Sequence, residues 1–150
     1  SGRYGALVRR VASSVDIHFT GYLDDRLVSI VLQRSAALIF ASLWEGFGIP
    51  ILEAMSARTA VVTSNLSSMP EVAGPHAFYA DPYDPEDLAR AMSDVLSLAP
   101  ADRERRLAEA AEYASQFTWQ KTADGMLRAI LDDFERNCDD TVAYESKRVA

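Results

Sequence analysis

The chain has 150 residues, a net charge of −7 and 49% hydrophobic residues. A compact chain of this length buries about 70% of its unfolded surface, so a core can form without disulfides or a metal. The single cysteine, Cys138, excludes a disulfide framework, and the negative charge argues against binding to nucleic acid or anionic lipid. No apolar run reaches about 18 residues and no signal-peptide pattern opens the chain, which favours a cytoplasmic location.

The beginning of the chain predicts a helix followed by a strand. Apolar residues recur at helical spacing from Tyr4 to Val11, and residues 15–19 have the composition of a strand. No strand precedes this helix and the chain starts at Ser1 rather than methionine, so we expect a fragment that lacks its upstream part. Asp24 is placed to cap a helix that covers about ten residues after it.

A glycine-rich turn joins the next strand to the next helix. Residues 37–41 form a short apolar run, which predicts a strand buried on both faces. Gly46 and Gly48 permit backbone angles and a close ligand approach that a side chain would prevent, and Pro50 suits the first turn of a helix. We therefore predict a helix from residue 49 or 50 to about Ala57.

The same alternation continues to the end of the chain. Residues 60–63 and 77–79 are predicted strands, and Asp84 caps a helix that begins with a proline and acidic residues. A charged, alanine-rich helix is expected at about 101–115. Thr118 then caps a last helix, whose apolar stripe consists of Trp119, Ala123, Met126, Leu127, Ile130, Leu131 and Phe134.

Alternating strands and helices predict a Rossmann-like, doubly wound parallel α/β sheet with helices on both faces. Residues 1–138 would form this domain, and residues 139–150, which carry little pattern, are expected to be a mobile tail. Ligands bind such sheets beyond the carboxyl ends of the strands. The turns at 20–23, 42–49 and 63–68 should therefore converge on one crevice.

The glycine turn combines an anion site with two carboxylates. A helix that starts near residue 49 presents unpaired N–H groups and the positive end of its dipole, which favour a phosphate or a diphosphate. Glu45 and Glu53 would repel that phosphate, so we expect them to accept hydrogen bonds from hydroxyls on either side of it. This pattern fits a sugar joined through a diphosphate to a ribose. The alternative is that both are ordinary solvated acids.

An ordered series of motifs surrounds these two glutamates. They are Gly21-Tyr22-Leu23-Asp24, Glu45-Gly46-Phe47-Gly48-Ile49-Pro50, Leu52-Glu53-Ala54-Met55, Thr63-Ser64-Asn65, Pro70-Glu71-Val72, Asp81-Pro82 and Phe117-Thr118-Trp119. Over roughly residues 15–135, the chain resembles the carboxyl-terminal domain of a retaining, family 4 type glycosyltransferase of the GT-B fold. The resemblance implies that the chain is the truncated, donor-binding half of such an enzyme.

The resemblance implies a role for each residue of the turn. Glu45 is the candidate catalytic residue, in contact with hydroxyls of the donor sugar, and Glu53 would hold the ribose. Tyr22 and Leu23 would lie against the nucleobase, and the phosphates would be met by Gly46, Phe47, Gly48 and Ile49. A covalent mechanism with Glu45 as nucleophile and a front-face retaining transfer remain alternatives. No metal or other cofactor is expected.

The resemblance also implies that parts of the enzyme needed for sugar transfer lie outside this chain. In the family, basic residues that neutralise the leaving diphosphate come from the earlier half of this domain, and the acceptor site comes from an amino-terminal domain. We therefore expect negligible transfer by this chain alone. Any membrane contact, peripheral to the inner membrane, would be made by the missing domain. Arg58 replaces a usual helix-ending glycine, which would cost about 1 kcal/mol if its backbone is left-handed.

Two other classes of function are weighed against a transferase. A non-catalytic binding or assembly module, such as one chain of a split transferase, would use its last helix to recruit a partner and would ignore nucleotides. A receiver-like regulatory domain needs clustered aspartates at strand ends and a later lysine; the first lysine is Lys121, so this reading ranks last. His18 and His76 lack Cys or His neighbours in sequence, which argues against a metal site.

Overall fold

The computed structural model describes residues 15–146, with side chains described from 15 to 134. The helix expected at the start of the chain lies outside these residues. The described elements are α2 (Asp25–Arg34), β1 (Ala37–Phe40), α3 (Ile49–Ser56), β2 (Ala60–Ser64), α4 (Met69–Ala73), the 3-10 helix η1 (Gly74–His76), β3 (Phe78–Ala80), α5 (Pro85–Leu96), α6 (Pro100–Ala114) and α7 (Trp119–Ser146).

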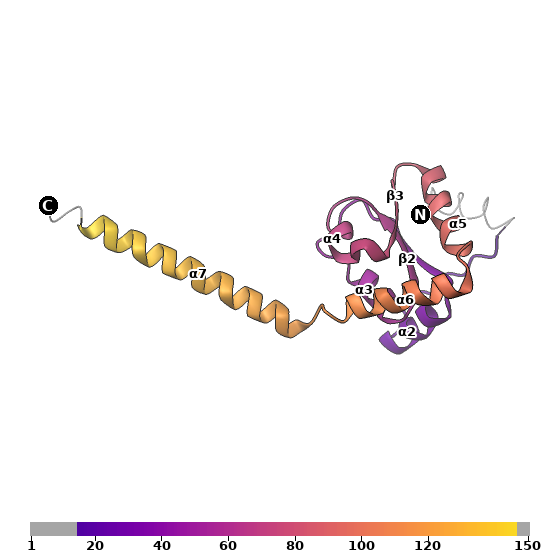
Figure 1. The fold of residues 1–150 in the computed structure, drawn as a ribbon, viewed down its shortest axis with the longest axis horizontal. Helices are drawn as coiled ribbons and strands as arrows, with labels where there is room; N and C mark the ends of the chain where they lie inside the picture. Colours follow the sequence, from indigo (N-terminus) through magenta and orange to yellow (C-terminus); the bar gives the residue numbers. More distant parts are fainter. Residues whose placement is uncertain (1–14, 147–150) are drawn as a thin grey trace.

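The three strands of the described region form one parallel sheet in the order β1-β2-β3 (Figure 1). Ala37 of β1 pairs with Ala60, and Val62 of β2 pairs with Phe78. Each strand is followed by a helix that returns the chain to the same end of the sheet, as parallel pairing requires. All three carboxyl ends therefore lie on one edge, where the predicted site residues gather.

Helices cover both faces of the sheet. β2 is buried along its whole length. Val61 packs in a cluster with residues of α2, α3, α4 and α6, such as Leu32, Met55, Val72 and Ala110. Val62 points to the opposite face and packs in a second cluster with Ala91 and Val95 of α5. The predicted doubly wound parallel architecture is confirmed.

Helix boundaries follow the capping residues that the sequence offers. The Asp24 carboxylate accepts a hydrogen bond of 2.8 Å from the Leu27 N–H at the start of α2. Asp84 caps α5 in the same way, by accepting from the N–H groups of Glu86 and Asp87. Thr118 accepts a bond of 3.2 Å from the Lys121 N–H, so the predicted start of α7 is confirmed.

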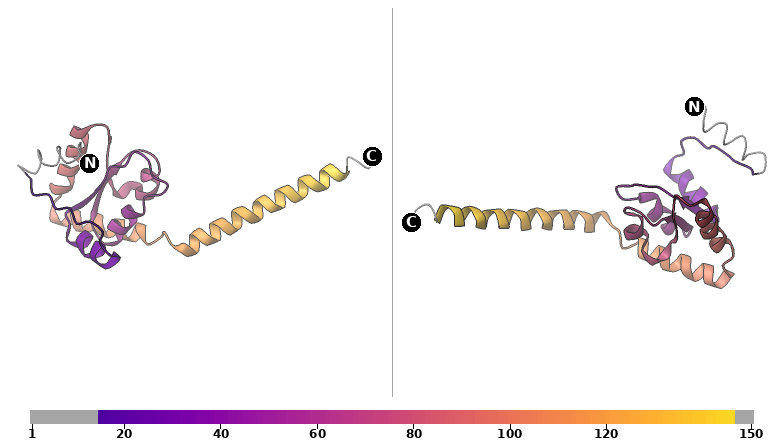
Figure 2. Two further views of the ribbon diagram at one scale, coloured as in Figure 1. Left: turned by 180° about the vertical axis from the view of Figure 1, so that it is seen from behind. Right: turned by 90° about the horizontal axis from the view of Figure 1, so that it is seen from above.

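Helix α7 extends away from the sheet as a long arm (Figures 1 and 2). Its predicted apolar stripe is exposed to solvent along the side chains that the structure describes, from Trp119 to Phe134. The helix continues to Ser146 and so includes most of the expected tail, whose mobility stays a prediction. No helix among the described residues combines the length and the apolar character that a membrane span needs.

Two predictions near the first strands were wrong. Residues 15–19 do not form a strand, and Phe19 is 76% exposed, because their backbone joins no neighbouring strand within the described part of the chain. A strand is stable only when a partner satisfies its N–H and C=O groups. β1 is only half-buried, with Ile39 39% exposed, because it forms an edge of the described sheet with one side unpaired.

Candidate functional site

A loop of eight residues, 41–48, joins the carboxyl end of β1 to helix α3. Gly48 precedes the helix with φ of 98°, a left-handed conformation that favours glycine. In the described part of the chain, no protein group accepts a hydrogen bond from the N–H groups of residues 46–49. These donors and the amino end of α3 together form a place where an anion can bind.

Hydroxyl groups from the end of β2 hold this loop from one side. Thr63 and Ser64 are buried, and their hydroxyls donate to the backbone oxygens of Phe40 (2.8 Å) and Ser42 (2.7 Å). Both bonds reach across from β2 to the neighbouring segment that leaves β1. The first half of the loop is therefore fixed to the sheet by side chains of the adjacent strand.

The next two hydroxyls hold the second half of the loop. Ser67 Oγ donates to the Glu45 carbonyl oxygen at 3.0 Å and accepts from the Glu45 N–H at 3.4 Å. Ser68 Oγ lies 3.2 Å from the same oxygen and 3.0 Å from the carbonyl oxygen of Phe47. The backbone on both sides of Gly46 is thus tied to the loop that follows β2.

The side chain of Glu45 is half-buried and has one protein partner in the described region. Ser42 Oγ donates to its Oε1 at 2.9 Å. This hydrogen bond holds one oxygen of the carboxylate in place. The second oxygen has no partner among the described residues, so it can accept a hydrogen bond from a ligand hydroxyl.

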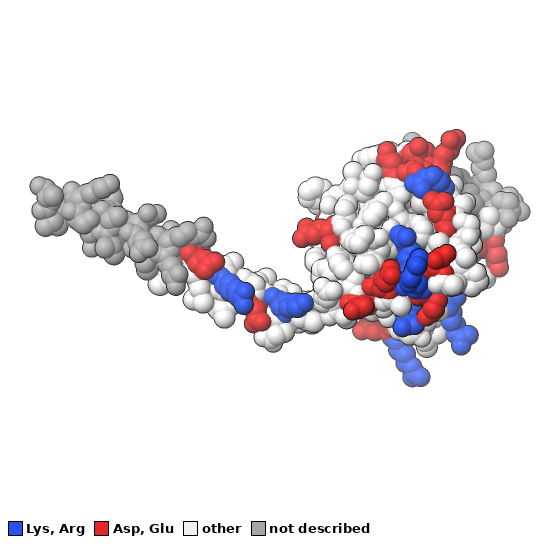
Figure 3. Space-filling model, in the orientation of Figure 1, with Lys and Arg blue, Asp and Glu red and all other residues white. Residues whose placement is uncertain are grey.

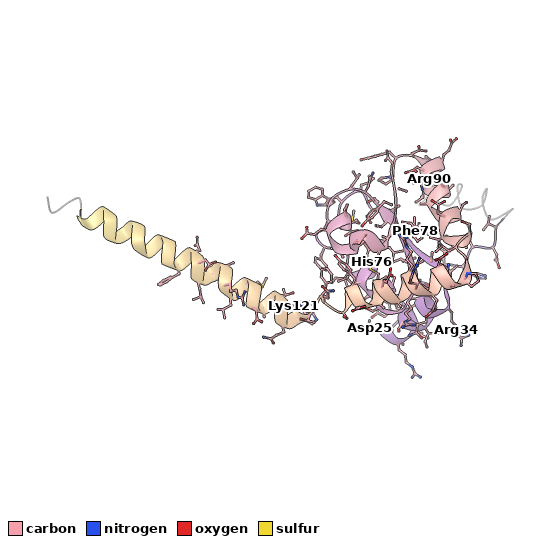
Figure 4. The ribbon with its side chains drawn as sticks, in the orientation of Figure 1. Asp25, Arg34, His76, Phe78, Arg90 and Lys121 are labelled. Carbon is pink, nitrogen blue, oxygen red and sulfur yellow. The ribbon has the colours of Figure 1, made fainter. Side chains whose placement is uncertain are left out.

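Glu53 lies on α3 and faces α2 rather than the glycine loop. It lines a groove of about 420 Å³ together with Asp25, Ser29, Gln33 and Ser56. Asp25 and Arg34 mark the two ends of α2, the opposite wall of this groove (Figure 4). No direct contact joins Glu45 and Glu53 in the described structure.

An apolar recess lies on the other side of the glycine loop, next to the start of α7. Its volume is about 640 Å³, and its walls include Phe47, Ile49, Leu52, Phe117 and Trp119. The rings of Phe47 and Phe117 meet edge to face, with centroids 6.1 Å apart. The loop that carries the free N–H groups is therefore packed against the segment that connects α6 to α7.

The electrostatics of the site come from backbone groups rather than from basic side chains. Residues 41–49 and 63–68 contain no lysine or arginine. Figure 3 shows positive and negative side chains intermixed over α5 and α6. Among the described residues, no group of three His, Cys, Asp or Glu side chains is arranged to hold a metal ion. Within these two loops, the attraction for an anion thus comes from the α3 amino terminus.

The sequence matches the family model described as glycosyl transferases group 1 over residues 6–130, which is most of the chain. The chain belongs to this family. It is 33% identical over 135 residues to the serotype-specific mannosyltransferase WbdA of Escherichia coli, covering 87% of this chain and 16% of that protein. It is 34% identical to the O-antigen chain mannosyltransferase B of Escherichia coli, covering 82% of this chain and 32% of that one. This group 1 glycosyl transferase domain thus spans less than a third of either relative's length.

Solved structures share the fold of the group 1 domain. A structure of the Candida albicans trehalose-6-phosphate phosphatase N-terminal domain superposes with a TM-score of 0.77 at 16% identity, over 87% of this chain and 30% of that one. A structure described as trehalose-6-phosphate from E. coli bound with UDP-2-fluoro glucose gives 0.69 at 19% identity, over 83% and 30%. The predicted GT-B, family 4 type domain is confirmed. At these identities the structural likeness shows the fold alone.

The group 1 domain brings together only part of the predicted site. Glu45 and residues 46–48 share one loop, and residue 49 begins α3 directly after it. Hydrogen bonds join this loop to residues 63–68, so two of the three turns expected to converge lie together. The turn at 20–23 has no hydrogen bond to either in the described structure; Tyr22 is 94% exposed and Leu23 is half-buried. The ligand roles of Glu45, Glu53, Tyr22 and Leu23 therefore stay predictions.

Sequence reasoning missed the residues that hold the loop. Ser67 and Ser68 were covered only by the predicted turn at 63–68, and Ser42 was not singled out at all. The available signal was a run of hydroxyl residues directly after a buried strand, at the edge where the glycine turn also opens. The pattern located these hydroxyls at the right edge but did not specify which backbone oxygens they would reach.

Proposed function

We propose that this chain binds the nucleotide-diphosphate sugar of a retaining hexosyltransferase. The observation that carries the proposal is the row of N–H groups at residues 46–49, unpaired within the described structure, between Glu45 and the first turn of α3. Such a row suits a diphosphate, because each N–H donates to a phosphate oxygen and the helix dipole adds a favourable field. Family membership supports the nucleotide-sugar class of ligand.

The two carboxylates then serve the two ends of the donor. Glu45 has one oxygen held by Ser42 and one without a protein partner in the described region, which suits a sugar hydroxyl. Glu53 lies on the side of α3 that faces α2, where it would accept from the ribose hydroxyls. Tyr22 and Leu23 precede α2, the other wall of the Glu53 groove, and would lie against the base.

The chemistry is the transfer of a hexosyl group with departure of a nucleoside diphosphate. Negative charge develops on the bridging oxygen as the glycosidic bond breaks, and the N–H groups at the helix terminus would stabilise it. Glu45 would act either as a nucleophile or as an electrostatic partner of the oxocarbenium ion in a front-face transfer. Because the two site loops contain no Lys or Arg, further positive charge must come from other residues, and the chain alone would transfer poorly.

The relatives suggest which donor to test first. Two of those named above are mannosyltransferases, and a further relative, 31% identical, is described as GDP-mannose-dependent. A second kind of relative, the glycogen synthase of Mycobacterium tuberculosis, is 33% identical over 75% of this chain and 28% of its own length. A mannosyl or glucosyl donor in polysaccharide assembly, in the cytoplasm, is our working assignment.

The test is ligand-observed NMR on this chain with UDP, GDP and ADP, repeated for Glu53→Ala. The matched control is Glu109→Ala, which removes an exposed acid from α6, outside the two site loops. We expect saturation transfer to the ribose protons of one nucleotide, lost in Glu53→Ala and kept in Glu109→Ala. Equal signals in both variants would refute the role of Glu53, and no signal at millimolar concentrations would refute donor binding by this chain.

A second function is favoured by the exposed stripe of α7. Met126, Ile130 and Phe134 lie on one side of a helix that extends from the domain, and all three are more than half exposed. Such a stripe fits an assembly module that recruits an amino-terminal transferase domain or another chain. This reading predicts a folded protein that binds none of the three nucleotides, so the same NMR experiment separates the two functions.

A further inference from the structure

The serines that follow β2 have a geometric relation to the donor loop that goes beyond simple attachment. We call Ser67 and Ser68 the serine clamp. Their hydroxyls donate hydrogen bonds to the carbonyl oxygens of Glu45 and Phe47, at distances from 3.0 to 3.2 Å. Each of these oxygens belongs to the peptide group that precedes a glycine of the turn, Gly46 or Gly48.

A trans peptide group links the direction of its carbonyl to that of its N–H. All described peptide bonds are trans, so the C=O of one residue and the N–H of the next point in opposite directions. When the clamp draws the Glu45 and Phe47 oxygens toward the β2–α4 loop, it turns the Gly46 and Gly48 N–H groups away from that loop. Two of the donors assigned to the diphosphate are therefore aimed by side chains that need not touch the ligand.

The backbone of Ser67 supports a specific role for the clamp. Its φ is 54°, a left-handed conformation that L-residues rarely adopt. In this conformation the hydroxyl forms a reciprocal pair, donating to the Glu45 oxygen and accepting from the Glu45 N–H. Backbone strain of this kind persists where the surrounding contacts determine it, and such places are often functional.

We propose that Ser67 and Ser68 are positioning residues, which fix the Gly46 and Gly48 N–H groups in the direction needed by the donor diphosphate. This inference rests on the proposed donor function. The clamp is made of protein groups alone, so it would prepare the anion site in advance and reduce the ordering that binding requires. Specificity for the sugar is not its task, since its hydroxyls are engaged by the backbone.

The experiment compares Ser67→Ala, Ser68→Ala and the conservative Ser68→Thr, which keeps a hydroxyl. The control is Ser115→Ala, which removes another exposed hydroxyl bonded to a backbone oxygen, that of Glu112 at 2.6 Å. Two quantities are measured on the 150-residue chain: the ¹⁵N relaxation and hydrogen exchange of the Gly46 and Gly48 amides, and the dissociation constants of UDP, GDP and ADP. Thermal unfolding is recorded for every variant.

In the two alanine variants we expect faster exchange and greater mobility of both glycine amides, and about five- to tenfold weaker binding of the preferred nucleotide. Ser68→Thr and Ser115→Ala should keep both properties. Unchanged glycine amides in the alanine variants would overturn the clamp itself. Altered amides with unchanged binding would overturn its positioning role, and an unmodified chain that binds no nucleotide would overturn the donor function on which that role rests.

Discussion

The ring of Tyr113 closes over the backbone of Gly74. A Cβ placed on Gly74 would lie 2.8 Å from Cζ and 2.9 Å from the hydroxyl oxygen of Tyr113. The hydroxyl of Tyr113 donates to the Glu71 carbonyl oxygen at 3.1 Å, so the ring cannot move away without losing that bond. The contact joins α6 to α4 and to the turn between α4 and β3.

We therefore predict that Gly74→Ala destabilises the domain by about 2 to 3 kcal/mol, since both the clash and the backbone angles oppose a side chain. The angles are φ 54° and ψ −147°, a region used almost only by glycine. Urea unfolding of the variant measures the change. Gly125→Ala is the control, because a Cβ there meets nothing within 4 Å; a similar loss in both variants would contradict the assigned cause.

Arg58 stands at the end of α3, where a glycine is usual, and its backbone is left-handed. Arg58 has φ of 56°, and the bonds that end α3 run from the Arg58 N–H to the Met55 oxygen and from the Thr59 N–H to the Ala54 oxygen. This is the pattern of a Schellman motif, in which glycine is preferred. The condition attached to the cost expected from the sequence, a left-handed backbone at Arg58, is therefore met.

We predict that Arg58→Gly is more stable than Arg58→Ala by about 1 kcal/mol. Both variants lose the ion pair of Arg58 with Glu104, at 2.8 Å between largely exposed side chains, so their difference isolates the backbone. The free energies of unfolding from urea titrations provide the comparison. Equal stability of the two variants would show that the left-handed backbone carries no measurable cost.

The carboxylate of Asp87 ties helix α5 to the turn before it. It accepts a bond of 2.8 Å from the Asp81 N–H and one of 2.7 Å from Arg90 Nε. The bond from the Asp81 backbone, followed by that from Arg90, lowers the pKa of Asp87 below its usual value. A lowered pKa stabilises the fold above the unfolded-state pKa of about 4, and this contribution is lost as the pH falls further.

We predict that Asp87→Asn melts at a lower temperature than the unmodified chain at pH 7, and that the difference shrinks below about pH 4. Thermal unfolding followed by circular dichroism over this pH range tests it. Asp102→Asn, which breaks an exposed pair with Arg105, should change the melting temperature little at any pH. A constant difference between Asp87→Asn and the unmodified chain down to pH 2 would rule out the carboxylate as its source.

Local signals predicted most of the fold, because they act over a few residues. Asp24, Asp84 and Thr118 cap the helices that follow them, as the sequence indicated. The strand predicted at residues 15–19 is absent because a strand depends on a neighbouring strand, and no local pattern shows whether that neighbour is present. The half-buried state of β1 has the same cause, since the composition of an edge strand and that of a central strand are alike here.

For the site, too, the sequence predicted the local features but not the contacts between loops. The sequence located the glycine turn, the helix start and the edge of the sheet, because spacing and residue type determine them. It did not predict that Ser67 adopts a left-handed backbone and pairs with Glu45, since the two residues are far apart in sequence and meet only through the register of β1 and β2. Contacts between loops can be predicted only once the register of the strands is known.

The two glycines of the turn have different roles, and replacing each of them by alanine distinguishes these roles. Gly48 needs its left-handed backbone, so Gly48→Ala should destabilise the domain by about 1 to 2 kcal/mol. Gly46 has no left-handed angle, and a Cβ there meets nothing within 4 Å of protein, so Gly46→Ala should leave the free energy of unfolding unchanged. A methyl group beside the free N–H groups would, however, obstruct the diphosphate, and nucleotide binding should be lost. Urea unfolding and ligand-observed NMR on both variants test this division; full binding by Gly46→Ala would mean that the phosphates do not approach the loop at this residue.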